Sequence, residues 1–66
     1  MSIHSTQAME LLTVTEAAEF LKISVPTTRR LQLQRNIPFV KVAGCVRFLK
    51  SDLLAYIGKR RVEAIE

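Results

Sequence analysis

This chain of 66 residues has few of the residue types that hold metals or form covalent cross-links. It contains one cysteine, Cys45, and one histidine, His4. A single cysteine cannot form an intramolecular disulfide, and one cysteine with one histidine cannot supply the ligands of a structural zinc site. This usage fits a reducing compartment. Because the sequence also shows no nucleophile–base set and no phosphate-binding loop, we expect neither an enzyme nor a cofactor.

Long apolar runs are also missing. No run approaches the 18 residues or so that a membrane helix needs, and the N-terminal MSIHSTQAME has no apolar core of signal-peptide length. We therefore predict a soluble cytoplasmic protein with no membrane partner. A chain of this size buries only about 60% of its unfolded surface, which favours a surface that binds a large partner over a deep cavity.

Acidic residues are scarce in the middle of the chain. All ten lysines and arginines lie between Lys22 and Arg61 with only one acid, Asp52, so this segment carries +9 (ten minus one), whereas the whole chain carries +4. The 21 residues before Lys22 contain no base. Such a concentrated positive field favours a polyanionic partner, either nucleic acid or an anionic membrane. The alternative is that the charge only keeps a basic protein soluble.

A first helix is predicted over residues 14–22. Thr13 and Glu16 have the spacing of a capping box, in which each side chain bonds to the other residue's backbone. The apolar residues that follow have the spacing of one helical face: Val14, Ala17, Ala18 and Leu21.

A second helix is predicted over residues 25–35, after a short connector. Ser24 is a candidate cap, and Pro26 suits the first turn, where its missing N–H costs nothing. We expect Asn36 to adopt the left-handed conformation that ends the helix, and Pro38 prevents its continuation. The inward residues should be Thr28 and Leu31, with Gln32 at the edge. Two helices joined by so short a turn form a helix-turn-helix pattern.

The remaining residues predict a β-hairpin and a third helix. Residues 39–49 alternate, with AGC between two runs and Gly44 able to adopt a positive φ. The hairpin should pack its apolar face on the helices. In the third helix, Ser51 is the candidate cap, and Gly58 either ends it or lies within it. The expected apolar stripe consists of Leu53, Leu54 and Ile57.

The predicted fold is therefore mainly α with a small β-hairpin. We divide the chain into a flexible leader, residues 1–10, a domain, residues 11–61, and an acidic tail, residues 62–66.

Five segments resemble one known family in their order and spacing: LLTVTEAAEFLKIS, TTRRL, IP, VKVAGCVRF and SDLLAYI. Over residues 11–57 they are similar to the small winged helix-turn-helix domains of the excisionase group, which are related to MerR-type and AlpA-like regulators. The resemblance implies a recognition helix in the major groove of double-stranded DNA. It also implies a hairpin wing on the neighbouring backbone or minor groove.

The resemblance also assigns candidate DNA-binding residues. Thr27, Arg29 and Arg30 match the polar face of the recognition helix, and Lys41 and Arg47 match basic residues of the two wing strands. Three departures from the family pattern change these expectations. Arg35 replaces a common glycine, so Asn36 takes over the turn. Cys45 occupies a wing tip that is often basic. Val25 and Pro26 replace polar residues, so base reading shifts to Thr27 and beyond.

Each candidate has a plainer interpretation. Arg29 and Arg30 diverge by about 100° on a helix, so one can clamp a phosphate while the other reads guanine, or both can belong to a solvated face. Thr27 can instead bond locally at the helix start, and Gln34 can reach adenine or stay solvated. Lys41 and Arg47 can instead protect an edge strand.

Other residues are open to the same two kinds of interpretation. Lys50 and the segment GKRR can add phosphate contacts or only solubility. An exposed Leu33 can contact a neighbouring protomer or nothing. Phe20 can belong to the core or to a partner surface.

Three functions remain open on the sequence. The first is a recombination directionality factor of a mobile genetic element, which binds tandem sites head to tail, bends the DNA and helps a site-specific recombinase (integrase). The second is a small transcriptional regulator, and both roles can coexist. The third is a protein-interaction module that binds an integrase. In the third case Leu33, Phe20 and the last helix would carry the binding.

Overall fold

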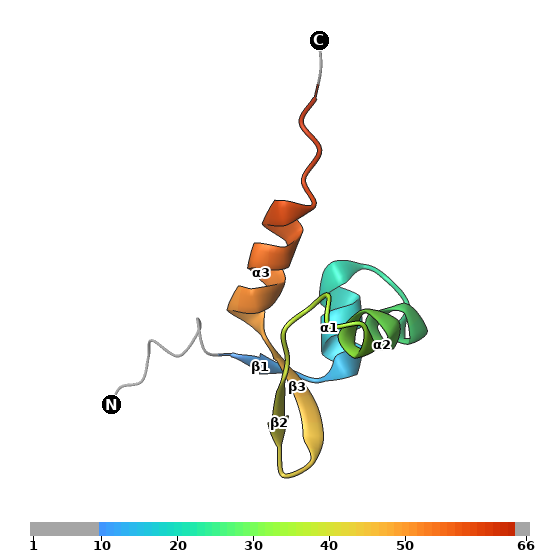
Figure 1. The fold of residues 1–66 in the computed structure, drawn as a ribbon, viewed down its shortest axis with the longest axis vertical. Helices are drawn as coiled ribbons and strands as arrows, with labels where there is room; N and C mark the ends of the chain where they lie inside the picture. The colour runs from blue at the N-terminus through green and yellow to red at the C-terminus, as the bar shows by residue number, and fades with distance from the viewer. Residues whose placement is uncertain (1–9, 65–66) are drawn as a thin grey trace, which may run out of the picture.

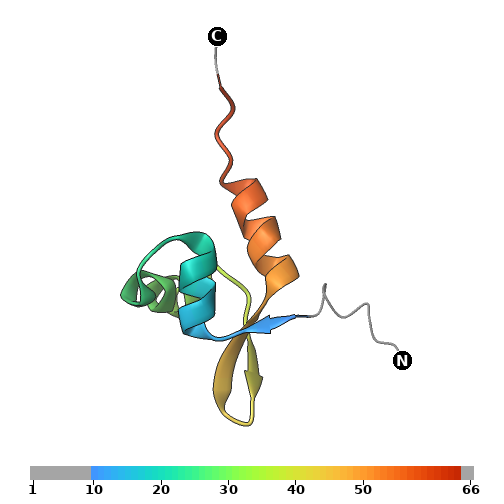
Figure 2. The same cartoon turned by 180° about the vertical axis from the view of Figure 1, so that it is seen from behind.

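The computed structural model describes residues 10–64, which form three helices and a small sheet (Figure 1). In chain order the elements are β1 (Leu11–Leu12), α1 (Val14–Leu21), α2 (Val25–Leu33), β2 (Val40–Val42), β3 (Cys45–Leu49) and α3 (Lys50–Lys59). The hairpin β2–β3 projects from one end and α3 from the other, with α1 and α2 to one side (Figures 1 and 2). This arrangement confirms a winged helix-turn-helix. No helix within residues 10–64 has both the length and the apolar character needed to cross a membrane.

Helix α1 begins with the predicted capping box. The Thr13 N–H donates to Glu16 Oε1 at 2.9 Å, and the Glu16 N–H donates to Thr13 Oγ1 at 3.1 Å. After the helix, Lys22 has a φ of 62°, and the Ile23 N–H donates to the Ala18 carbonyl at 3.0 Å. This left-handed residue turns the chain sharply toward α2.

Helix α2 begins at the predicted cap. Ser24 Oγ accepts a hydrogen bond from the Thr27 N–H at 3.2 Å. The fully buried Thr28 donates its hydroxyl proton to the Ser24 carbonyl at 2.9 Å, so this buried polar side chain has a partner. Thr28 therefore faces inward, as predicted, and α2 packs on α1.

The prediction that Asn36 ends α2 in the left-handed conformation is wrong, because Arg35 does so, with a φ of 63°. The Arg35 N–H donates to the Gln32 carbonyl at 3.1 Å, and the Asn36 N–H donates to the Leu31 carbonyl at 2.9 Å. These two bonds form a Schellman motif, whose left-handed position is usually glycine. Position 35 therefore keeps the conformation that glycine would favour, although its side chain is long and charged.

Because of this conformation, glycine substitutions at two neighbouring positions should change the stability in opposite directions. Arg35→Gly is expected to raise the free energy of unfolding by about 1 kcal/mol, because a β-carbon at positive φ is strained. Gln34→Gly is the matched control. Since Gln34 has a φ of −82°, glycine relieves no strain there and should lower the free energy of unfolding. Urea denaturation followed by circular dichroism measures both. Equal effects of the two changes would contradict the assigned turn.

The sheet has three strands in the order β1-β3-β2, although a two-stranded wing was predicted. Strand β1 pairs antiparallel with β3, with Leu11 opposite Leu49 and Leu12 opposite Phe48. A strand of two residues has no periodicity to detect, so the sequence carried no signal for it. Its pairing makes β3 the central strand and buries Phe48 completely.

The tip of the hairpin consists of Ala43 and Gly44, with φ values of 53° and 83°. Positive φ at both central residues is typical of a type I′ turn, whose twist matches that of the flanking strands. The prediction that Cys45 occupies the tip is therefore wrong, because Cys45 begins β3 and pairs with Val42.

The register sets which residues share a face of the hairpin. Val40 lies opposite Arg47, and Lys41 lies opposite Val46. Opposite residues of an antiparallel pair point to the same side of the sheet. Val46 and Phe48 therefore face the helices, whereas Val40 and Val42 share the outer face with Arg47.

Helix α3 follows β3 without a loop. Its N-cap residue is Leu49, whose side chain forms no capping hydrogen bond. The prediction that Ser51 caps the helix is therefore wrong. The Lys50 N–H instead donates to the Glu10 carbonyl at 3.0 Å, which ties the helix start to the chain just before β1. The helix continues through Gly58 to Lys59.

The core lies where α1, α3 and the inner face of the sheet meet. Its buried members are Leu12, Ala17, Ile37, Phe48 and Leu53. Of the apolar stripe predicted for α3 only Leu53 is buried, whereas Leu54 and Ile57 are exposed. Of the predicted leader, residues 1–9 lie outside the described residues, as do residues 65–66 of the predicted tail.

Candidate nucleic-acid interface

One face of α2 is free of contact with the rest of the fold. Successive residues of an α-helix are about 100° apart. Arg30 and Leu33 therefore point away from the inward Thr28, and Arg29 lies at the flank of this outer face. Arg29 and Arg30 are both exposed, and Leu33 is 74% exposed.

The outer face of α2 is strongly positive. The helix contains no acidic residue, and Arg35 lies two residues beyond its end. Within residues 10–64, no salt bridge involves Arg29, Arg30 or Arg35. Their charges are therefore available to an external anion, and each long side chain can turn toward it.

Thr27 lies at the edge of this face and is half-buried. Its hydroxyl oxygen accepts a hydrogen bond from the Ser24 hydroxyl at 2.8 Å. Thr27 therefore forms a local hydrogen bond at the helix start, and the partner is the side chain of Ser24. A hydroxyl has one proton and two lone pairs, so Thr27 can still donate to a ligand.

Gln34 also has a local partner. Its Oε1 accepts a hydrogen bond from Asn36 Nδ2 at 3.1 Å. This bond orients the Gln34 amide at the C-terminal end of α2 and leaves its NH₂ group free to donate. A bidentate contact with adenine would require this bond to break, because such a contact uses both the amide oxygen and the NH₂ group.

The two basic residues of the wing do not form one cluster. Lys41 is exposed and belongs to the side of the hairpin that carries Val46, whereas Arg47 belongs to the opposite side. Arg47 is half-buried, and its Nη1 donates to the Val46 carbonyl at 2.8 Å. The wing therefore presents one positive charge on each of its faces.

The remaining lysines and arginines of α3 and its exit differ in their contacts. Lys50 Nζ lies 3.8 Å from Glu10 Oε1 and 5.8 Å from the centre of the Phe20 ring. Arg60 stacks over Tyr56 at 4.6 Å from the ring centre. Arg61 Nε lies 3.6 Å from Glu63 Oε2. Lys50 and Arg61 are thus partly neutralised within the chain.

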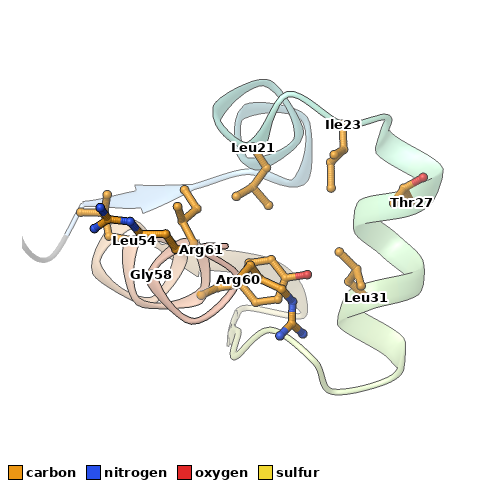
Figure 3. Close-up of a pocket in the computed structure, with 10 residues that line it drawn as sticks. Leu21, Ile23, Thr27, Leu31, Leu54, Gly58, Arg60 and Arg61 are labelled. Atoms are coloured by element: carbon orange, nitrogen blue, oxygen red, sulfur yellow. The ribbon is translucent and has the colours of Figure 1, made fainter. Parts of the chain in front are cut away.

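An open apolar groove lies between the helix-turn-helix and α3, and sequence reasoning did not find it. Its volume is about 740 Å³, and Figure 3 shows Leu21, Ile23 and Leu31 pointing into it. Leu54 and Arg60 belong to the wall that α3 and its exit form. The exposed Leu54 and Ile57 were a possible signal, but the sequence alone assigned them to the core.

A family model described as a helix-turn-helix domain matches residues 11–61. The chain belongs to this helix-turn-helix family, which is the AlpA/excisionase type. The match begins at β1 and ends just after α3, so it includes the whole ordered fold. No curated protein and no solved structure matches the chain significantly.

Membership of the helix-turn-helix family supports binding to double-stranded DNA. In such domains the second helix of the motif enters the major groove. Here that helix is α2, whose outer face is both uncovered and positively charged.

Proposed function

We propose that this chain is a sequence-specific DNA-binding protein that acts as a recombination directionality factor of the excisionase type. One observation carries the DNA-binding part of the proposal. The exposed Arg29 and Arg30 lie on the free face of the second helix of the motif, and within residues 10–64 neither forms a salt bridge. The recombination role is supported by the family type.

In the proposed complex α2 lies in the major groove, which is wide enough to admit one helix. Arg30, near the middle of the outer face, reads guanine, and Arg29, at its flank, clamps a phosphate. A bidentate arginine–guanine contact contributes roughly 1–3 kcal/mol of discrimination. Thr27 and the NH₂ group of Gln34 add contacts at the two ends of the helix.

The hairpin acts as the wing of this complex. The type I′ turn at Ala43 and Gly44 is narrow and has no large side chain, so the tip can approach the DNA backbone closely. Lys41 and Arg47 lie on opposite faces of the wing. A wing inserted beside a groove therefore places one charge toward each of the flanking phosphate strands.

Several copies are proposed to bind tandem sites head to tail. Two separate apolar surfaces support this arrangement. Leu11 and Val42, 45% and 49% exposed, belong to the outer face of the sheet, and Leu54 and Ile57, 53% and 43% exposed, belong to α3. A head-to-tail interface joins two different surfaces of identical chains and repeats along the DNA.

The proposed role requires no catalysis. Neutralised phosphates supply binding energy, and the bound copies bend the DNA so that an integrase can act in the direction of excision. Such a protein works in the cytoplasm of a bacterium, associated with the nucleoid when bound, and belongs to a mobile genetic element.

Gel electrophoresis of the protein with DNA from its own genomic neighbourhood tests this role. Tandem binding should give a ladder of several complexes on an attachment site. Bending should slow the migration of these complexes further when the site lies at the middle of the DNA fragment. Excision by the neighbouring integrase should then depend on the protein. A single unbent complex, with excision unaffected, would contradict the proposal.

The transcriptional regulator remains the second candidate. It uses the same α2 surface, but it predicts one sharp complex at a promoter and a change in transcript level. The groove between the helix-turn-helix and α3 supports the third candidate, an integrase-binding module. That candidate predicts that Leu54→Ala weakens integrase binding, whereas changes to Arg29 and Arg30 do not.

A further inference from the structure

Leu33 is an apolar side chain in the middle of a polar, positively charged helix face. It is 74% exposed, the highest value among the large apolar residues of the described helices and strands. It lies in the last turn of α2, four residues after Arg29 and three after Arg30. Residues at these spacings are neighbours on a helix surface.

Leu33 is also isolated from the other exposed apolar residues of the described chain. Leu11 and Val42 belong to the sheet, and Leu54 and Ile57 belong to α3. Its neighbours on α2 are charged or polar, so it has no apolar patch of the kind that a protein partner requires. The surface around Leu33 instead suits a polyanion with a small apolar group.

The major groove of DNA offers one such group. Among the base edges exposed there, the C5 methyl of thymine is apolar, and the others present hydrogen-bond donors and acceptors. We infer that Leu33 contacts the C5 methyl group of a thymine and makes the protein select thymine at one position of its site. This inference rests on the proposed binding of α2 in the major groove, and it adds a specificity determinant that hydrogen bonding does not provide.

The contact should change affinity by a measurable amount. Burying one methyl-sized group contributes about 0.8 kcal/mol, which corresponds to about a fourfold change in affinity. The γ and δ carbons of leucine, which alanine lacks, are the atoms that would contact the methyl group. The contact also discriminates against cytosine, which has no methyl group at this position.

Deoxyuridine scanning tests the inference, because deoxyuridine differs from thymidine only in lacking this methyl group. A binding site is first selected from random DNA with the unmodified protein. Each thymine of that site is then replaced in turn, and the affinity of single-site complexes is measured for the unmodified protein and for Leu33→Ala. Leu33→Met tests rescue by a side chain of similar length, and Val62→Ala is the control, because Val62 is 90% exposed and lies beyond α3.

At one thymine, replacement should weaken the unmodified protein and the Leu33→Met and Val62→Ala variants about fourfold, and it should not weaken Leu33→Ala. Equal sensitivity of the unmodified protein and Leu33→Ala at every thymine would overturn the inference and leave the proposed function standing. The same holds if Leu33→Ala alters only the spacing of complexes in a ladder, because Leu33 would then contact a neighbouring copy. If no specific site can be selected at all, both the inference and the proposed function fail.

Discussion

The double change Arg29→Ala, Arg30→Ala is expected to reduce affinity for the specific site by at least about fivefold, since the guanine contact alone contributes roughly 1–3 kcal/mol. The loss of a phosphate contact adds to this effect and flattens the salt dependence by about 0.9 units of slope. Both side chains are exposed and form no salt bridge within residues 10–64, so the free energy of unfolding should change little. Fluorescence anisotropy with labelled DNA, at several salt concentrations, measures the loss.

The matched control removes the same charge from another place. The double change Lys59→Ala, Arg61→Ala also lowers the net charge by two. Both residues are exposed, as Arg29 and Arg30 are, but they lie at the end of α3 or just beyond it. This variant should weaken specific and non-specific binding alike, and only modestly, because it changes the general field alone. If the two double variants lose affinity equally, position on α2 has no special importance, and the recognition-helix assignment fails.

Phe48→Ala is expected to cause the largest loss of stability. Phe48 is fully buried in the central strand β3. It lies opposite Leu12 in the sheet and belongs to the core with Ala17 and Leu53. Truncating a buried phenylalanine costs about 3–5 kcal/mol, whereas a domain of this size has only about 3–10 kcal/mol of stability at 0.05–0.15 kcal/mol per residue. Thermal denaturation followed by circular dichroism should show a melting temperature lowered by at least about 12 °C.

Two further variants make this prediction testable even if Phe48→Ala does not fold. Phe48→Leu keeps most of the apolar volume and should fold with a lower melting temperature and a loss of about 1–1.5 kcal/mol. Val42→Ala, at a position that is 49% exposed on the same hairpin, should change the stability by less than about 0.5 kcal/mol. Similar melting temperatures for Phe48→Leu and Val42→Ala would place Phe48 outside the core and contradict the assigned fold.

The helix-turn-helix could be predicted because its signals are local. The capping box of Thr13 and Glu16 fixes the start of α1, and Ser24 fixes the start of α2. Each signal consists of a side chain that bonds to backbone within three residues, so it acts before any tertiary contact forms. For the same reason Thr28 could be assigned to the interior from spacing alone.

The wrong predictions concern places where tertiary contacts override local preference. Asparagine adopts positive φ more readily than arginine, yet Arg35 lies at the required position, because the buried Thr28 and Ile37 fix where α2 must turn. Ser51 is a better cap than Leu49, yet the Glu10 carbonyl, just before β1, already accepts the hydrogen bond of the Lys50 N–H. In both cases the position of the element, and not the residue type, decides the outcome.

The faces of the wing show a similar limit. Alternation in residues 39–49 predicts strands, but it does not say which valines face the helices, because that depends on the register. The type I′ turn at Ala43 and Gly44 sets the register, and it separates Lys41 from Arg47. The groove beside α3 could not be predicted, since it depends on how α3 packs relative to the helix-turn-helix.

The most direct test of the central claim is the affinity of the unmodified protein for a selected DNA site and for a shuffled sequence of the same composition, across a salt series. Sequence-specific binding through α2 predicts tighter binding to the selected site at every salt concentration, by about a thousandfold or more near physiological salt. Equal affinities that fall together and vanish as salt rises would contradict it. The positive charge of α2 would then act only as a general attraction for polyanions.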